Sequence, residues 1–126
     1  YWVRDFLNVV VSTTSSNKPY HVTIPAHGCA VVTVQLGRNN AITYLGSDLH
    51  LSQGMELAEW KPGPNSVSAT LRLPRKASGH VYIAIPAEFA TVKVNNRLTE
   101  AIAVLPGVLE IPVDVDGFVN IEITMR

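Results

Sequence analysis

Apolar and polar residues alternate along most of the chain with the period of two that β-strands show. In residues 66–74 (SVSATLRLP) every second residue is apolar, and the residues between them are mainly polar. Similar alternation, or a run of β-branched residues, recurs in seven further stretches: 21–25, 30–36, 80–86, 90–95, 101–106, 108–115 and 118–125. The pattern shows no helical stripe of comparable strength, so it predicts strands throughout.

Turn signals separate these stretches. Asn95-Asn96 and Asp116-Gly117 suit two-residue hairpin turns, because Asn, Asp and Gly tolerate a positive φ, and Pro106-Gly107 suits a type II turn. Pro112 lies inside a predicted strand, which indicates an edge position or a bulge, since proline donates no hydrogen bond. We therefore expect an all-β antiparallel β-sandwich of about eight to ten strands with Greek-key-like links.

The predicted core takes the apolar residues that share one face of each stretch. These are Val22, Ile24, Val32, Val34, Leu71, Leu73, Val81, Ile83, Val92, Val94, Ile102, Val104, Ile111, Val113, Ile121 and Ile123.

The composition indicates a globular protein and disfavours several other classes. The chain has 126 residues, of which 47% are hydrophobic and 16% charged, as expected of one globular domain spanning residues 1–126. Ten basic and ten acidic residues cancel and form no basic block, so nothing favours nucleic acid. No apolar run approaches the ~20 residues of a membrane helix, and no signal-peptide pattern opens the chain. The single cysteine excludes an internal disulfide and a cysteine-based zinc site.

His27 lies in the sequence Pro25-Ala26-His27-Gly28, between two apolar stretches. We expect a corner residue whose ring hydrogen-bonds to nearby backbone, with Gly28 required for a backbone angle or a close approach. The other histidines have no metal-ligand spacing relative to it.

Candidate catalytic and metal-binding groups are few. Glu56 and Glu59 are three positions apart, so in a strand their side chains would point to opposite faces and could not act as a catalytic pair. We expect both to be solvated charges. Ser47 and Asp48 are expected to form a turn rather than a catalytic group with His50. Residues 114–122 resemble a calcium loop but lack its third ligand, so no metal or other cofactor is expected.

Aromatic side chains could bind a sugar. A pyranose ring stacks on an exposed aromatic face, and Trp60, at the edge of the loop 61–65, and Tyr44 are the candidates for this contact. The alternative for Trp60 is packing over one end of the sandwich.

Two stretches of the chain resemble a known family. Val3-Arg4-Asp5, the corner Pro25-Ala26-His27-Gly28 and the apolar run that follows it resemble the start of the C-terminal β-sandwich of α-galactosidases of glycoside hydrolase families 27 and 36. Residues 44–60 are similar to the segment that follows this unit in some bacterial relatives. The sequence departs from the family at Phe6-Leu7, where a tryptophan is usual after Arg-Asp-Leu.

The resemblance implies a non-catalytic accessory domain, because the family's catalytic aspartates lie in an upstream (β/α)₈ barrel of ~250 residues. The chain would then be the C-terminal part of a larger glycoside hydrolase, not an enzyme itself, and extracellular or periplasmic. Its partner would be that barrel, contacted through the bulky N-terminal segment, with Trp2 and Phe6 as candidate interdomain residues. In isolation this surface would be exposed or covered by a second copy in a dimer. The alternative is an autonomous carbohydrate-binding module.

Overall fold

Ten antiparallel strands occur in the part of the chain that the structure describes, in agreement with the sequence pattern. The computed structural model describes residues 1–37, 40–51, 54–86 and 90–126. Its strands are β1 (Trp2–Asp5), β2 (Val10–Thr13), β3 (Val32–Gln35), β4 (Thr43–Ser47), β5 (Leu57–Pro62), β6 (Ser66–Ala84), β7 (Ala90–Val94), β8 (Arg97–Leu98), β9 (Ile102–Leu105) and β10 (Val108–Met125). They form a three-stranded sheet, β2-β1-β3, and a seven-stranded sheet in which β4-β6-β10-β7-β8 are neighbours, with β5 beside β6 and β9 beside β10. No helix capable of crossing a membrane occurs in the described part of the chain.

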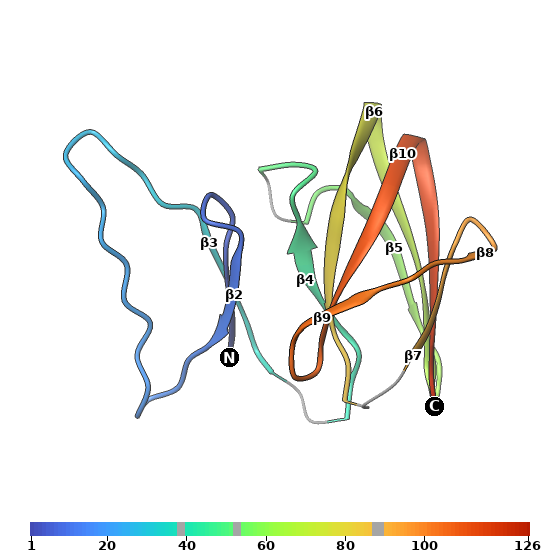
Figure 1. Ribbon diagram of the computed structural model, residues 1–126, viewed down its shortest axis with the longest axis horizontal. Coiled ribbons are helices and arrows are strands. Elements are labelled where there is room, and N and C mark those ends of the chain that lie inside the picture. Colours follow the sequence, from blue (N-terminus) through green and yellow to red (C-terminus); the bar gives the residue numbers. More distant parts are fainter. Residues whose placement is uncertain (38–39, 52–53, 87–89) are drawn as a thin grey trace.

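Two long strands, β6 and β10, pair along nearly their whole length and fold over together (Figure 1). The pairing is irregular where Asp116 lies opposite Lys76 and Phe118 opposite Arg72. Gly117, between them, has a φ of 78°, which glycine adopts without strain. The predicted hairpin at Asp116-Gly117 is therefore wrong. These residues form a bulge at which one continuous strand bends, because the partner strand β6 bends with it.

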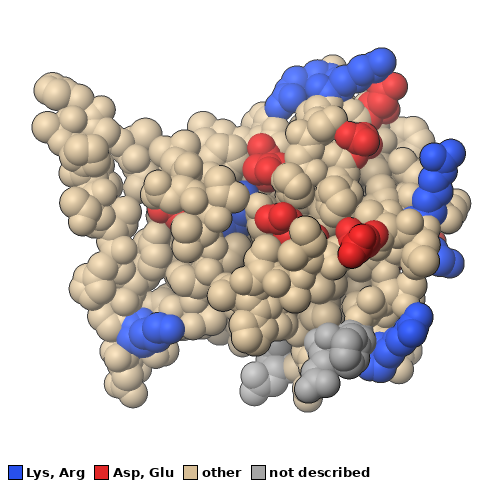
Figure 2. Space-filling view, viewed as in Figure 1, with Lys and Arg blue, Asp and Glu red and all other residues tan. Residues whose placement is uncertain are grey.

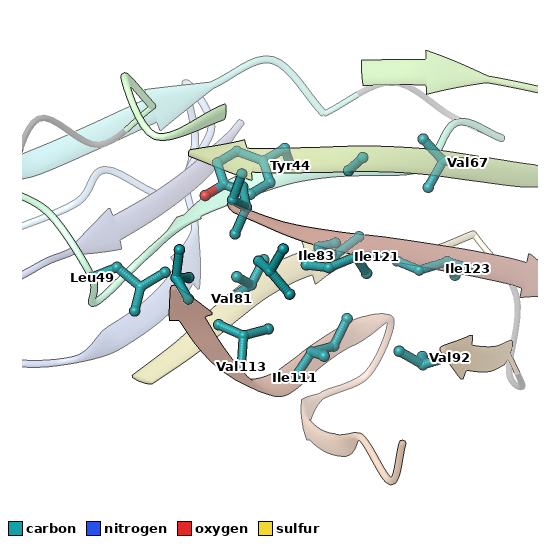
Figure 3. Close-up of a cluster of buried hydrophobic side chains, with 14 of the residues drawn as sticks. Tyr44, Leu49, Val67, Val81, Ile83, Val92, Ile111, Val113, Ile121 and Ile123 are labelled. Carbon is teal, nitrogen blue, oxygen red and sulfur yellow. The ribbon is translucent and has the colours of Figure 1, made fainter. Parts of the chain in front are cut away.

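The bend turns the seven-stranded sheet into two facing layers. Residues 66–73 of β6 lie with β5 and the second half of β10, whereas residues 77–84 lie with β4 and the first half of β10. Alternate apolar side chains from both layers meet between them (Figure 3). This main core consists of Tyr44, Leu49, Val67, Ala69, Leu71, Leu73, Val81, Ile83, Ile85, Val92, Ile111, Val113, Val115, Val119, Ile121 and Ile123. Burial of this apolar surface is the main source of stability, at ~25 cal/mol per Å².

The three-stranded sheet packs against the outer side of the layer that contains β4. Leu45, Tyr82, Ala84 and Val108 form a second buried cluster there, and Trp2, Val11 and Leu105 pack against it. The molecule is thus sandwich-like, with the small sheet added as a further layer (Figure 1).

Five predicted core residues are exposed instead of buried. Their exposed fractions range from 40% for Val104 to 60% for Ile102, and the other three are Val22, Ile24 and Val34. Ile102 and Val104 lie in β9, which is paired with β10 only through residues 108–110. Alternation correctly marks the strands β3 and β9, which contain Val34, Ile102 and Val104, but it cannot tell which face of a strand receives a covering layer.

Residues 14–31 form a long arm between β2 and β3, which Figure 1 shows extending away from the three-stranded sheet. The predicted strand at residues 21–25 is wrong, because this segment pairs with no other strand of the described chain. Every residue from 21 to 29 is exposed. A strand needs a neighbour for its backbone groups, and periodicity alone does not supply one.

Two predicted turns are confirmed. Asn95 and Asn96 have φ angles of 48° and 64°, as a type I′ turn between β7 and β8 requires, and Gly107 has a φ of 76° between β9 and β10. Pro112 lies in a part of β10 that pairs with β6 on one side only, so its predicted edge position is also confirmed.

Candidate functional site

A cluster of polar side chains lies where the three-stranded sheet meets the larger sheet. Its centre is Asp48, the residue that follows β4, together with His80 on β6. The backbone N–H of His80 donates to Asp48 Oδ1 at 2.6 Å, and His80 Nδ1 lies 3.0 Å from Asp48 Oδ2. The backbone N–H of Asp48 donates in turn to the carbonyl of His80 at 3.1 Å. Gly79 makes this approach possible, because a Cβ there would collide with the Asp48 carboxylate.

The cluster continues on the same side of the sheet to Glu110, Tyr82 and Arg4. His80 Nε2 lies 4.0 Å from Glu110 Oε1, and the Tyr82 hydroxyl is hydrogen-bonded to Glu110. The guanidinium of Arg4 lies over the Tyr82 ring, 4.7 Å from its centroid. Burial lowers the pKa of Arg4, and the negative charge of Asp48 partly opposes this shift. Burial also raises the pKa of Tyr82 to about 12, with Glu110 adding to the effect.

This arrangement orients the His80 ring and keeps the Tyr82 hydroxyl protonated. Asp48 fixes the His80 ring through Nδ1, while Nε2 and the half-exposed ring edge remain turned toward Glu110. A carboxylate-oriented histidine is a general base when a substrate proton lies within hydrogen-bond distance. No group of three His, Cys, Asp or Glu side chains is placed to hold a metal ion among the described residues.

Glu56 is buried, so the prediction of a solvated charge is wrong for this residue. Its side chain is 1% exposed and accepts three hydrogen bonds, from the Tyr44 hydroxyl (2.7 Å), the Ser47 hydroxyl (2.8 Å) and the backbone N–H of Gly54 (3.0 Å). These donors replace the lost water and make burial of the carboxylate possible. Burial and Glu56 together raise the pKa of Tyr44, which keeps its hydroxyl a donor. Glu59 is solvated as predicted, where it pairs with Lys61 at 3.0 Å.

Trp60 and Tyr44 lie together, but differ in exposure. Their rings meet edge to face with centroids 6.1 Å apart, and Tyr44 is buried whereas Trp60 is half-buried. Both line an open groove of about 670 Å³ that is also bordered by Gln35 and Leu57. Trp60 packs against the main core with one part of its ring, so a sugar contact through its remaining surface stays a prediction.

His27 lies at a corner, as predicted, but the predicted hydrogen bond of its ring to nearby backbone is wrong. The Gly28 N–H donates to the Pro25 carbonyl at 2.9 Å, which closes a turn, and His27 holds the positive φ of 61°. Gly28 is required for a close approach, because a Cβ there would lie 2.9 Å from the Pro25 ring. Its exposed ring makes no hydrogen bond that we find in the described chain, so the backbone alone forms the corner.

Trp2 and Phe6, the candidate interdomain residues, are both half-buried. Trp2 packs against the second buried cluster, and the Phe6 ring lies 5.4 Å from the Arg4 guanidinium carbon. Among residues 1–7, Tyr1 and Leu7 are the more exposed, at 60% and 49%.

Sequence reasoning missed the Asp48–His80 pair. The two residues lie 32 positions apart and meet only because β4 pairs with the end of β6. The available signal was Gly79 beside a histidine inside an apolar strand, since glycine within a strand often marks a close approach.

Comparisons with known proteins give no relative for this chain: no family model, no curated protein and no solved structure matches it.

The first prediction concerns Glu56. Glu56→Ala removes the acceptor of three hydrogen bonds and leaves buried donors unpaired, so we expect a loss of about 2–4 kcal/mol in the free energy of unfolding. Glu59→Ala is the matched control, and its effect should stay within about 0.5 kcal/mol because Glu59 is exposed. Urea unfolding measures both. Equal losses in the two variants would contradict the role of Glu56.

The second prediction concerns Tyr82 at high pH. An unfolded tyrosine titrates near pH 10. Folded Tyr82 keeps its proton until about pH 12, so the native state binds more protons between these values and stability falls as pH rises through them. We expect the loss of stability over this range to be smaller by about 2–3 kcal/mol in Tyr82→Phe and unchanged in Tyr1→Phe. The raised pKa of Tyr44 leaves a remaining loss in every variant. Urea unfolding at a series of alkaline pH values measures it. An identical pH profile in Tyr82→Phe and the unmodified chain would refute the assignment.

Proposed function

We propose that this chain is a non-catalytic accessory domain of an α-galactosidase-like glycoside hydrolase, and that it packs against and stabilises an upstream (β/α)₈ barrel. The observation that supports the proposal is the apolar outer face of the three-stranded sheet. The resemblance of residues 3–35 to the family supplies the identity of the partner.

The registers of β1, β2 and β3 define this outer face. Trp2 and Arg4 point toward the larger sheet, so the side chains that alternate with them point outward. Apolar residues dominate this side, and four of them are largely exposed: Tyr1 (60%), Val10 (47%), Val34 (57%) and Leu36 (56%). They surround Val3 and Asp5 of the central strand β1, which are buried. An apolar sheet face of this kind is typical of a surface that another domain covers.

Hydrogen bonds to Asp5 fix the conformation of the backbone around this face. Asp5 is buried within it and accepts hydrogen bonds from the Asn8 side chain (2.8 Å), the Asn8 backbone N–H (3.1 Å) and the Tyr20 hydroxyl (3.2 Å). The hydrogen bonds from Asn8 lower the pKa of Asp5. The residues around the apolar face are therefore fixed before a partner arrives, which reduces the entropy cost of docking.

The third prediction tests the barrel as the partner. The region encoded directly upstream of Tyr1 is expressed separately and mixed with this chain, and we expect a stable complex in which only the upstream region hydrolyses nitrophenyl α-galactosides. Val34→Asp should weaken the complex by roughly ten- to a hundredfold, because it places a charge in an apolar contact. Phe118→Asp, at the exposed bend of β10, is the matched control and should bind normally.

Isothermal titration calorimetry measures the affinities, and the sequence of the upstream region decides the identity of the partner. An upstream region that encodes no barrel, or glycosidase activity in this chain alone, would refute the proposal.

Carbohydrate binding is the second candidate function, and the groove beside Trp60 is the observation that favours it. Part of the indole lines an opening of about 670 Å³, where Gln35 and Thr43 supply polar groups. This combination of an aromatic surface and nearby polar groups is typical of weak sugar sites.

The fourth prediction tests that groove. The chain has two tryptophans, so Trp2→Phe leaves Trp60 as the only indole reporter. Titration of this variant with soluble galactosides should change its fluorescence, and Trp60→Ala should weaken sugar binding about tenfold when calorimetry measures it. Tight binding lost in Trp60→Ala would favour the autonomous module over the accessory domain. No binding by the unmodified chain would exclude this candidate.

A further inference from the structure

The middle of β10 has an open edge. β10 pairs with β9 through residues 108–110 and with β7 through residues 121–125, whereas on that side residues 111–117 pair with no strand of the described chain. An unpaired strand edge offers backbone N–H and C=O groups to any extended segment that can lie beside it.

Hydrogen bonds at His80 show which backbone groups face this edge. Both the N–H and the C=O of His80 bond to Asp48, on the β4 side of β6. His80 lies opposite Pro112, so this is a non-hydrogen-bonded pair, and the backbone of Pro112 also points away from β6. By alternation, the edge presents the C=O of Pro112 and the N–H and C=O of both Asp114 and Asp116.

A groove of about 920 Å³ runs along the edge, and the β7–β8 hairpin forms its far wall. Val113 and Val94 lie on the side of the groove that faces the main core, and Leu98 of the hairpin is 76% exposed beside them. Ser78 and Asp114, joined by a hydrogen bond of 2.6 Å, lie on the other face of the sheet. An added strand would therefore meet apolar groups on one face and polar groups on the other.

The arm carries a segment with the same alternation. In residues 21–25 (HVTIP), Val22 and Ile24 lie on one side of an extended chain and His21 and Thr23 on the other. Val22 and Ile24 are 43% and 51% exposed, and the segment has no strand partner in the described structure. Its length matches that of the open edge at residues 112–116.

Charge favours the same pairing. Residues 6–37 contain no Asp or Glu but include Lys18, His21 and His27. The open edge carries Asp114 and Asp116, although Lys76 lies 3.8 Å from Asp116 and Arg97 lines the opposite wall of the groove. In Figure 2 the arm shows one basic patch and no acidic one, whereas the main body carries both acidic and basic side chains. Attraction of the arm is therefore centred on Asp114, which forms no ion pair in the described part of the chain.

We propose that residues 21–25 of one copy add as a strand to the open edge of β10, residues 112–116, in a second copy. Within one molecule the arm and the β7–β8 hairpin lie at opposite ends, so the arm does not occupy its own groove (Figure 1). The contact is a β-strand addition between copies, with backbone hydrogen bonds supplying affinity and the two-sided groove setting the register. It uses other residues than the proposed barrel contact, and either can fail without the other.

The test compares two substitutions at Asp114. Asp114→Pro removes the outward N–H, and Asp114→Ala keeps this N–H and removes only the side chain. Sedimentation velocity over a range of concentrations should show a dimer or longer assembly for the unmodified chain. Asp114→Pro should weaken association about tenfold relative to Asp114→Ala. Thermal unfolding checks that both variants fold, which is expected because the N–H of residue 114 does not pair with β6.

Substitutions in the arm keep the proposal testable if Asp114→Pro does not fold. Ile24→Asp places a carboxylate against an acidic edge and an apolar wall, and should abolish association. Met55→Asp, at a residue that is 84% exposed outside the arm and the groove, is the control and should associate normally.

The single cysteine, Cys29, identifies the contact directly. It is exposed in the arm, four residues after Pro25, and accepts a maleimide photocrosslinker. We expect crosslinks to residues 95–99 or 112–116, and a mixture of isotopically light and heavy chains should show that they join different copies. A chain that stays monomeric up to millimolar concentration, or crosslinks confined to one copy, would overturn the proposal.

Discussion

The pairing of β6 with β10 is the constraint on which the rest of the structure depends. A single antiparallel ladder runs through both strands and bends once, near Gly117, so its two halves supply both facing layers of the main core. Every other strand of the larger sheet attaches to one of these two: β4 and β5 to β6, and β7 and β9 to β10, with β8 continuing from β7. The positive φ at Gly117 therefore matters beyond its own position, because a strained bend would separate the two layers.

Hydrogen-bonded polar side chains hold the loop segments that lie outside the β6–β10 pairing. Glu56 collects donors from β4 and from the loop before β5, while Asp48 closes the corner after β4 onto His80. Glu56 is fully buried, so its hydrogen bonds act in a medium where losing one partner is costly. The Asp48 side chain is 28% exposed, so water partly screens its contact with His80. Arg4 has a comparable place between the two sheets, where its guanidinium lies between the Phe6 and Tyr82 rings. Of these contacts, the one between Arg4 and Tyr82 joins the small sheet to the larger one.

Sequence periodicity predicts the strands well and their partners poorly. Residues 66–74 and 80–86 each alternate clearly, yet nothing in their spacing shows that they form one strand, because the bend between them depends on the matching bend in β10. The residues next to Glu56 in the sequence suggest a surface charge. Its carboxylate is buried because the hydroxyls of Tyr44 and Ser47 donate to it, and the sequence near Glu56 does not reveal these donors. The corner at His27 and the turn at Asn95-Asn96 are predictable because their causes are local: a positive φ and a short hydrogen bond.

Two surfaces of the described structure lack the protection that a free β-sandwich usually has. A free β-sandwich protects its edges and covers its apolar faces, since both promote association. Here the outer face of the small sheet exposes Val10 and Val34, and the middle of β10 offers an unpaired edge. These are different kinds of surface: the first can only be covered by packing, whereas the second can be extended by hydrogen bonds. A globular domain suits the first and an extended segment suits the second, so one partner of either kind would leave the other surface open. The two surfaces therefore differ in the kind of contact that each can form, and neither contact would interfere with the other.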